Sequence, residues 1–143
     1  MPLNSNIWFL KGLNGERKLP EIDDHTHIWG ESVEPLLLCN DNQLFDVALA
    51  AECLWRHELH DNLVQSIVHC LKPGGWAYIV FSHHGPEGTE DKDLAFFEIA
   101  EREGLLVTSH ETELGAHMWT EDKQVEIHTY QLVKKVVNGD NAT

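Results

Sequence analysis

Apolar and polar residues alternate along this chain in blocks whose periods predict strands and helices in turn. The run from Phe45 to Ala51 is apolar on both faces, as in a strand that helices cover on either side. Apolar residues then recur at helical spacing from Leu59 to Leu71, and the KPGG stretch at Lys72 to Gly75 contains the residues that end a helix. Trp76 to Ser82 is again a short apolar run, which predicts a second buried strand.

The second half of the chain continues this alternation. A helix is expected to begin near Thr89, whose side chain can cap its first turn, and to end at Gly104. Two further strands are predicted at Leu105 to Thr108 and at Val125 to Leu132. From Phe45 onward the predicted order is therefore β-α-β-α-β-β, which indicates an α/β domain.

The hydrophobic pattern also predicts how the chain is divided. A strand is expected at Ile22 to Ile28, upstream of the alternating elements. Residues 1–20 are weakly patterned, and residues 138–143 are expected to form a frayed tail. We therefore predict a single domain over residues 21–137.

Composition narrows the classes of partner. The 143 residues carry 24 acidic and 10 basic side chains, for a formal net charge of −14. This balance argues against nucleic acid, because affinity for phosphates depends on Lys and Arg. No apolar run approaches the ~18 residues that a membrane span needs, so we expect no membrane partner.

Cysteine usage indicates the redox compartment. Cys39, Cys53 and Cys70 are odd in number and lie in or beside apolar segments. Such residues are expected to be reduced, structural thiols, and not members of a disulfide framework. This favours a cytoplasmic protein or, alternatively, a nuclear one.

Two histidine motifs raise the possibility of a metal site. The stretch from Asp24 to Trp29 reads DHTHIW, and His25 and His27 would face the same way if the segment were extended. DxHxHxW at a strand end resembles the opening motif of amidohydrolase-type metal-dependent hydrolases, but their eight-stranded barrel needs about 250 residues. The HELH stretch at 57–60 places its second histidine one residue too early for a zinc-protease helix. We therefore expect no metal, and keep the hydrolase as the least favoured hypothesis.

A longer set of motifs points to a different family. The segment FDVALAAECLWRHELHDNLVQSIVHCLKPGGWAYIVFSHH, followed by EDKDLAFFEIAEREGLLV, resembles the second half of a class I S-adenosylmethionine-dependent methyltransferase. More narrowly, it is similar to the nicotinamide N-methyltransferase-like group, which includes fungal lysine methyltransferases of elongation factors. HIWGESVEPLL, at His27 to Leu37, resembles the Trp-Gly segment of that group.

The resemblance implies a fold. Members of this family have a Rossmann-like sheet of seven strands in the order 3-2-1-4-5-7-6, with strand 7 antiparallel. The elements from Phe45 onward then correspond to strands 4-5-7-6, with the last strand in the chain antiparallel. Strands 1 and 2 are expected to be missing, so this chain would hold only the carboxyl-terminal half of the sheet.

The resemblance also implies a site at the carboxyl ends of the strands, where open α/β sheets bind their ligands. Trp29, Gly30 and Ala51 would contact the cofactor S-adenosyl-L-methionine, with the Trp29 ring beside its adenine. Glu52 would lie near the transferred methyl group, where a carboxylate can orient an amine or hold its charge. Two alternatives stay open: Glu52 as a helix-capping acid, and Trp29 as an ordinary core aromatic.

The acceptor side of the site is expected to be formed by residues that end or follow the two central strands. These are Trp55, His83 and His84. The acceptor itself would be a protein amine, on lysine or at an amino terminus, or a small amine such as nicotinamide. The acidic composition favours a basic protein target through charge complementarity.

One family feature has no counterpart in the sequence. The glycine-rich turn of the type ExGxGxG, which lets the backbone approach the methionine part of the cofactor, is not found; the early glycines are Gly12 and Gly15. We therefore expect weak cofactor binding and weak or no catalysis by this chain. The alternative function is a non-catalytic remnant that binds a partner, or a second copy of itself, through the exposed strand edge at Phe45 to Ala51.

Overall fold

The computed structural model describes residues 22–117 and 122–137, which contain four strands and four helical segments. The predicted weakly ordered segment 1–20 and the predicted tail 138–143 lie outside the described residues. In chain order the elements are α1 (Glu34–Leu38), β1 (Phe45–Ala51), η1 (His57–Leu59), α2 (His60–Cys70), β2 (Leu71–Phe81), α3 (Glu90–Arg102), β3 (Leu105–Ala116) and β4 (Gln124–Lys134). The predicted β-α-β-α-β-β order is confirmed.

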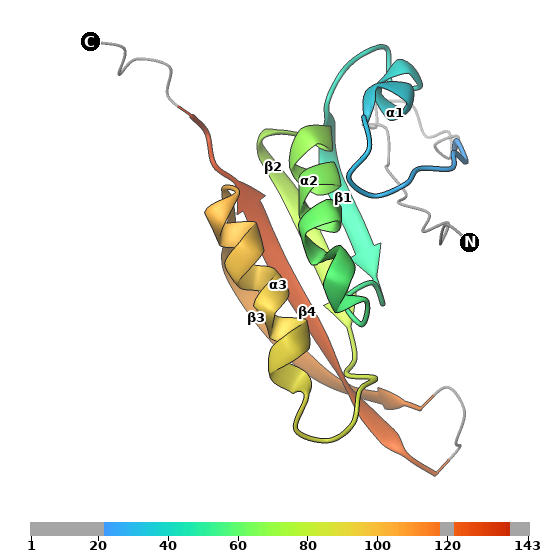
Figure 1. Ribbon diagram of the computed structural model, residues 1–143, viewed down its shortest axis with the longest axis vertical. Helices are drawn as coiled ribbons and strands as arrows, with labels where there is room; N and C mark the ends of the chain where they lie inside the picture. Colours follow the sequence, from blue (N-terminus) through green and yellow to red (C-terminus); the bar gives the residue numbers. More distant parts are fainter. Residues whose placement is uncertain (1–21, 118–121, 138–143) are drawn as a thin grey trace, which may run out of the picture.

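The strands form one mixed sheet in the order β1-β2-β4-β3 (Figure 1). β1 and β2 are parallel, and β4 runs antiparallel to both β2 and β3. This is the 4-5-7-6 arrangement that the resemblance implies, with the last strand antiparallel. The predicted fold class, the carboxyl-terminal half of a Rossmann-like methyltransferase sheet, is therefore confirmed.

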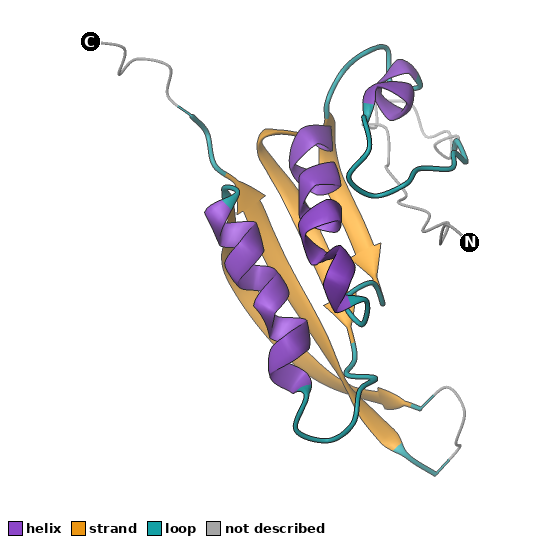
Figure 2. Cartoon of the chain, in the orientation of Figure 1, coloured by secondary structure: helices purple, strands orange, loops and turns teal. Residues whose placement is uncertain are grey.

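The two long helices cover the same face of this sheet, α2 over β1 and β2 and α3 over β4 and β3 (Figure 2). They meet the strands in one hydrophobic core, which includes Leu63, Val64 and Ile67 of α2 and Phe96 and Ala100 of α3, packed on Ala48, Ala50, Ala77, Ile79, Phe81 and Leu132. Small residues on β1 let α2 lie close to the sheet, while Phe81 fills the space between α3 and β2. This core fixes the positions of the strand ends that carry the candidate site.

The prediction that helices cover β1 on both faces is wrong for the described residues. Alternate residues of a strand point to opposite faces, and Leu49, which points away from α2 and α3, is 42% exposed. On the same outer face, Trp76 of β2, which pairs with Val47, is 37% exposed. The apolar run of β1 therefore marks a face that no helix of the described residues covers.

The predicted strand at Ile22 to Ile28 is also wrong. The segment has no regular secondary structure, and both Ile22 and Ile28 are exposed. Only His27 and Trp29 are buried there, where they pack beside α2. A strand needs a backbone partner, and β1 has no second neighbour in the described sheet, so alternation of side chains alone did not produce a strand.

Several predicted boundaries shift. β2 begins at Leu71, directly after α2, and the KPGG residues lie in a register shift against β1, where Phe45 pairs with Leu71 but Val47 with Trp76. β3 is longer than the predicted Leu105 to Thr108, because its polar continuation pairs with β4 as a solvated hairpin. Thr89 precedes α3 without the predicted side-chain cap.

Thr89 is held by a different contact. Its Oγ1 donates to the Pro86 carbonyl at 2.6 Å, so the hydroxyl is not available to the first turn of α3. Acidic side chains in that turn remain favourable for the helix dipole. Among the described residues no helix is long and apolar enough to cross a membrane.

Candidate functional site

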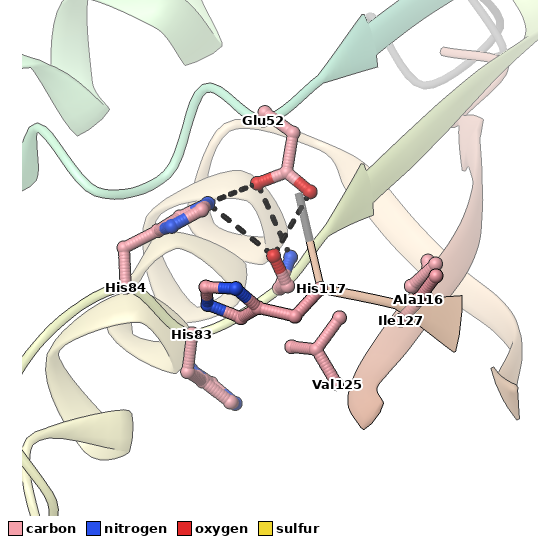
Figure 3. A pocket seen from close by; sticks show the side chains of 8 residues that line it. Glu52, His83, His84, Ala116, His117, Val125 and Ile127 are labelled. Atoms are coloured by element: carbon pink, nitrogen blue, oxygen red, sulfur yellow. Dashed lines mark hydrogen bonds and ion pairs between the residues drawn. The ribbon is translucent and has the colours of Figure 1, made fainter. Parts of the chain in front are cut away.

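The candidate site lies where the parallel strands β1 and β2 end. The carboxyl ends of parallel strands meet at one edge of a sheet, so residues that follow β1 and β2 come together there (Figure 1). Glu52 follows the last residue of β1, and Ser82, His83 and His84 follow the last residue of β2. These residues are far apart in the sequence but share one pocket (Figure 3).

Glu52 is the centre of a hydrogen-bonded cluster. Its backbone is in the left-handed region with φ of 55°, while its N–H still donates to the Val80 carbonyl at 2.8 Å. The Ser82 hydroxyl donates to Glu52 Oε1 at 3.0 Å, and the Ser82 amide donates to Oε2 at 3.3 Å. The turn in the backbone therefore aims the carboxylate across the sheet edge at the end of β2.

His84 completes this cluster. Its Nε2 lies 2.6 Å from Glu52 Oε2 and 3.3 Å from the Ser82 hydroxyl. Both the Glu52 and the His84 side chains keep about half of their surface exposed, at 40% and 50% respectively. The pair is thus a carboxylate and an imidazole in contact with each other and reachable from solvent, which is suited to binding a cation or moving a proton.

The pocket has a polar wall and an apolar wall. Its volume is about 170 Å³, and Glu52, Ser82, His83 and His84 form the side made by the ends of β1 and β2. The hairpin of β3 and β4 forms the other side, with Ala116, His117, Val125 and Ile127 (Figure 3). Such a site can hold a ligand that carries a positive charge at one end and hydrocarbon at the other.

A second carboxylate lies behind this pocket. Asp93 of α3 has only 5% of its side chain exposed, and its two oxygens contact different histidines. Oδ1 lies 2.6 Å from His57 Nε2, and Oδ2 lies 2.7 Å from His83 Nδ1. The carboxylate is thus satisfied by two imidazoles that come from η1 and from the end of β2.

The structure brings together some of the predicted site residues. Glu52, His83 and His84 share the pocket, and Ala51 is exposed at the end of β1 beside them. The alternative in which Glu52 caps a helix is wrong, because the next helical segment, η1, has Arg56 as its N-cap and no side-chain capping bond. The Glu52 carboxylate contacts Ser82 and His84 instead.

Trp55 is not among the residues that line the pocket. Its ring is 49% exposed, and the Arg56 guanidinium lies over it at 5.3 Å from the ring centroid. A cation over an indole face is a stabilising contact in its own right. A role for Trp55 in binding the acceptor stays a prediction.

Trp29 and Gly30 lie apart from the pocket, against α2. Trp29 is 8% exposed and belongs to the main hydrophobic core, and its buried Nε1 has no hydrogen-bond partner among the described residues. Gly30 has φ of +89°, and its N–H donates to the Ser66 hydroxyl at 2.9 Å. The core interpretation accounts for the burial of the ring, while contact of either residue with a cofactor stays a prediction.

His25 and His27 have different environments. His27 is buried, with Nε2 2.9 Å from the Ser66 hydroxyl, whereas His25 is exposed. Burial lowers the pKa of His27 below its usual value, although Glu31 opposes this effect. Within residues 22–117 and 122–137, no three His, Cys, Asp or Glu side chains are arranged to hold a metal ion.

Sequence reasoning missed part of the pocket. The sequence pattern identifies Ser82 only as the end of a predicted strand. A signal was present, because residues two apart in an extended segment face the same way, so Ser82 and His84 share one side. Asp93 is one of three acidic residues in the first turn of α3, and its local sequence pattern does not distinguish it from the other two. The hairpin residues Val125 and Ile127 gave no signal, because their proximity to Glu52 depends on how far β3 and β4 extend beyond the sheet.

The Cys53 and Cys70 thiols are not activated. Burial and the neighbouring Glu52 charge raise the pKa of Cys53 to about 11, and burial raises that of Cys70 to about 12. Cys39, Cys53 and Cys70 are all free. Cys70 is buried, as expected for a structural cysteine, whereas Cys39 and Cys53 are half-buried, so a structural role for these two stays a prediction.

Comparisons with known proteins give the family. No family model matches the chain. It is 36% identical to protein N-terminal and lysine N-methyltransferase EFM7 of Kluyveromyces lactis over 106 residues, which cover 72% of this chain and 39% of that protein. It is 39% identical to efm7 of Neurospora crassa over 88 residues, covering 57% of this chain and 31% of that one.

A third sequence relative and one solved structure are also similar to the chain. Efm7 of Schizosaccharomyces pombe is 27% identical over 116 residues, covering 74% of this chain and 45% of that protein. A solved S-adenosylmethionine-dependent methyltransferase from Methanosarcina mazei is 14% identical, with a TM-score of 0.49 over 65% of this chain and 60% of that one. The chain spans less than half the length of the three sequence relatives. The strand order of the sheet and the related sequences together show that the chain belongs to the class I S-adenosylmethionine-dependent methyltransferases, as a part of that domain.

Proposed function

We propose that this chain is the carboxyl-terminal half of an S-adenosylmethionine-dependent N-methyltransferase whose acceptor is an amine of a protein. The single observation that carries the proposal is the Glu52 carboxylate, which lies at the carboxyl end of β1 in contact with Ser82 and His84. The sequence relatives are named as protein N-terminal and lysine N-methyltransferases, which supports a protein acceptor. We extend that chemistry to this pocket.

In this proposal Glu52 and the hairpin of β3 and β4 bind different parts of the acceptor. Lysine side chains and chain termini are positively charged at neutral pH, so the Glu52 carboxylate attracts the acceptor amine before it reacts. The apolar wall at Val125 and Ile127 packs on the hydrocarbon part of a lysine side chain. His84, in contact with Glu52, is placed to take up the proton that the amine has to lose before it can act as a nucleophile.

S-adenosylmethionine supplies an electrophilic methyl group when it is bound. The residues proposed to hold it are Trp29, Gly30 and Ala51. Trp29 Nε1, which has no hydrogen-bond partner in the described part of the chain, offers a donor to such a ligand. The small, exposed Ala51 at the end of β1 permits close approach. A glycine-rich turn is not found in the described ranges, so we propose that binding and turnover by this chain are weak.

The proposal is tested by titrating isotope-labelled protein with S-adenosylmethionine and recording amide and indole resonances. We expect shift changes confined to Gly30, Ala51, Glu52 and the Trp29 indole N–H, with a Kd weaker than about 100 µM, or roughly −5.5 kcal/mol. If the spectra show no localised change up to about 10 mM S-adenosylmethionine, the cofactor proposal is contradicted. A Kd of about 10 mM corresponds to only about −2.7 kcal/mol, and even that binding would be detected. Tighter binding than about 100 µM contradicts the weak-binding part of it.

The acceptor is identified with two matched peptides and radiolabelled cofactor. One peptide carries lysine and a blocked amino terminus, and the other carries a free amino terminus and no lysine. Nicotinamide serves as the small-amine control. Transfer to nicotinamide alone would contradict a protein acceptor, and turnover within tenfold of an intact efm7 relative would contradict the expected weakness of this chain.

A second candidate function is non-catalytic binding of a partner through β1. It is favoured by one observation, the exposure of Leu49 and Trp76 on the sheet face that no described helix covers. β1 is also an edge strand of the described sheet, and edge strands are sites where another polypeptide can add by strand pairing. A partner polypeptide, or a second copy of this chain, would cover that edge, and failure to bind cofactor in the titration above would favour this function. For either function we propose a cytoplasmic or nuclear location, which the three free thiols support.

A further inference from the structure

Two histidines, each close in the sequence to one member of the Glu52–His84 pair, contact the same buried carboxylate. Glu52 is followed five residues later by His57, and His84 is preceded directly by His83. Both histidines contact Asp93 of α3, at 2.6 Å and 2.7 Å. The segments that carry the two members of the pair are therefore tied to the same point on the helical layer.

The backbone between β2 and α3 explains why this tie matters. β2 ends at Phe81, and residues 82–84 have no regular secondary structure, so ladder hydrogen bonds do not hold them. In an extended segment alternate side chains face opposite ways. Ser82 and His84 accordingly point to Glu52, while His83 points away from Glu52 (Figure 3) and contacts Asp93.

The contact of His83 with Asp93 is the anchor on the side opposite to Glu52. The His83 ring also packs edge-on against Phe81 at 5.5 Å and against His128 at 5.0 Å between centroids, which limits its rotation. With His83 fixed, the backbone of residues 82–84 cannot turn without breaking these contacts. His84 is thereby held at 2.6 Å from Glu52, although half of its own side chain is exposed.

We propose that Asp93 is a positioning residue of the acceptor site, which aligns His84 with Glu52 through His83 and His57. The assignment rests on the proposed function for its catalytic meaning, but the alignment itself concerns this chain only. Asp93 does not line the pocket, so it acts through the two histidines and not by touching an acceptor. Its burial and its two short contacts favour one orientation of each imidazole, because a carboxylate accepts from both and donates to neither.

The test uses Asp93→Asn with Asp91→Asn as the matched control. Asp91 lies in the same first turn of α3 and is exposed, so its replacement removes the same charge without touching a histidine. An asparagine side chain has one accepting oxygen and a donating NH₂, so it cannot accept from both histidines. We expect one of the two imidazoles to move its proton to the other ring nitrogen in Asp93→Asn, seen by long-range ¹H–¹⁵N spectra, and no such change in Asp91→Asn.

The alignment of the pair is measured at Ser82, whose amide donates to Glu52. Hydrogen exchange of this amide is expected to become at least tenfold faster in Asp93→Asn and to stay unchanged in Asp91→Asn. Amides in the middle of β1 and β2 report that the fold is intact. A folded Asp93→Asn protein with unchanged Ser82 exchange and unchanged tautomers would overturn the proposal.

If Asp93→Asn does not fold, a second pair of variants tests whether the contact between His83 and Asp93 aligns the pair. His83→Asn keeps a donor near the position of Nδ1, whereas His83→Ala removes it. We expect Ser82 exchange close to that of the parent in His83→Asn and at least tenfold faster in His83→Ala, and equal rates in the two variants would overturn the proposal. None of these measurements needs cofactor or acceptor, so a failed cofactor titration would remove the proposed function and leave this result standing.

Discussion

At the scale of single residues, Glu52 combines a strained backbone with the central position in the hydrogen-bonded cluster of the site. A residue other than glycine in the left-handed region costs about 1 kcal/mol or more, since its Cβ crowds the following carbonyl. Here the φ of 55° turns the carboxylate from the end of β1 toward Ser82 and His84. Strain at such a position is typical of sites where function selects the residue.

This strain predicts the order of stability of two variants that both lack the carboxylate. Glu52→Gly removes the Cβ as well, while Glu52→Ala keeps it, so the difference between them isolates the backbone strain. We expect Glu52→Gly to have a free energy of unfolding higher than that of Glu52→Ala by about 1 kcal/mol. Urea denaturation of the two proteins measures this difference in the free energy of unfolding. If Glu52→Ala is as stable as Glu52→Gly or more stable, the backbone at position 52 is not strained.

At the scale of elements, the junction of α2 and β2 depends on close backbone packing. β2 starts directly after α2 at Leu71, and the register against β1 shifts between Phe45 and Val47. A Cβ at Gly75 would lie 2.8 Å from the Lys72 carbonyl oxygen and 3.0 Å from that of Asp46. Neither oxygen belongs to a flexible side chain, so a larger residue displaces the start of the β1–β2 pairing.

The prediction is that Gly75→Ala destabilises the protein by about 1–3 kcal/mol and opens the start of β1. Gly104→Ala is the control. Gly104 lies in the turn between α3 and β3 with φ of +93°, and no atom of residues 22–117 and 122–137 lies within 4 Å of an added Cβ. Both variants lose stability. Hydrogen exchange at Val47 is expected to accelerate in Gly75→Ala only, and equal acceleration in Gly104→Ala would show that the packing at Gly75 is not special.

At the scale of the whole molecule, buried imidazoles link stability to pH. Burial lowers the pKa of His27, His60 and His128 below the usual value, and His83 and His110 lower that of His128 further. The unfolded chain binds protons at these positions near pH 6.5, and the folded protein binds them only at lower pH. Stability is therefore lost as pH falls below about 6.5, because the unfolded state then holds more protons.

His60 offers a measurement of this linkage. Its Nε2 lies 2.7 Å from the Leu54 carbonyl oxygen, and burial is the largest cause of its lowered pKa. Gln at this position keeps a donor near Nε2 but does not titrate. Between about pH 8 and pH 5 we expect His60→Gln to lose less stability than the parent, by up to about 1.4 kcal/mol per pH unit.

The control for His60 is His25→Gln, which removes an exposed imidazole. Its profile is expected to follow that of the parent. Free energies of unfolding from urea titrations at each pH give the slopes. Parallel profiles for His60→Gln and the parent would mean that His60 titrates alike in the folded and unfolded chain.

The uncovered sheet face is the second property of the whole molecule with a measurable consequence. Exposed apolar residues on an edge strand favour association, while the net charge of −14 opposes it, so we expect self-association to increase with salt. Leu49→Lys on β1 is expected to reduce it. Leu114→Lys changes an even more exposed leucine, on β3, and is expected to leave self-association unchanged.

Sedimentation at several protein and salt concentrations measures this association. A chain that stays monomeric throughout would contradict the homodimer and leave only a different partner for the β1 edge. Equal effects of Leu49→Lys and Leu114→Lys would place the contact elsewhere. These outcomes concern the second candidate function and do not depend on cofactor binding.

The sequence by itself determined the order of the elements, because the period of apolar residues and the breakers KPGG and Gly104 are local properties. The family came from the sequence too, through the resemblance that its ordered motifs carry. It also placed Glu52 and His84 near each other, since residues that follow parallel strands meet at one edge. Only the tertiary structure decided that Ile22 to Ile28 is not a strand, because a strand exists only with a partner. It likewise decided that Asp93 joins His57 to His83, since a contact between residues 36 and 10 positions apart arises from packing and leaves no periodic trace in the sequence.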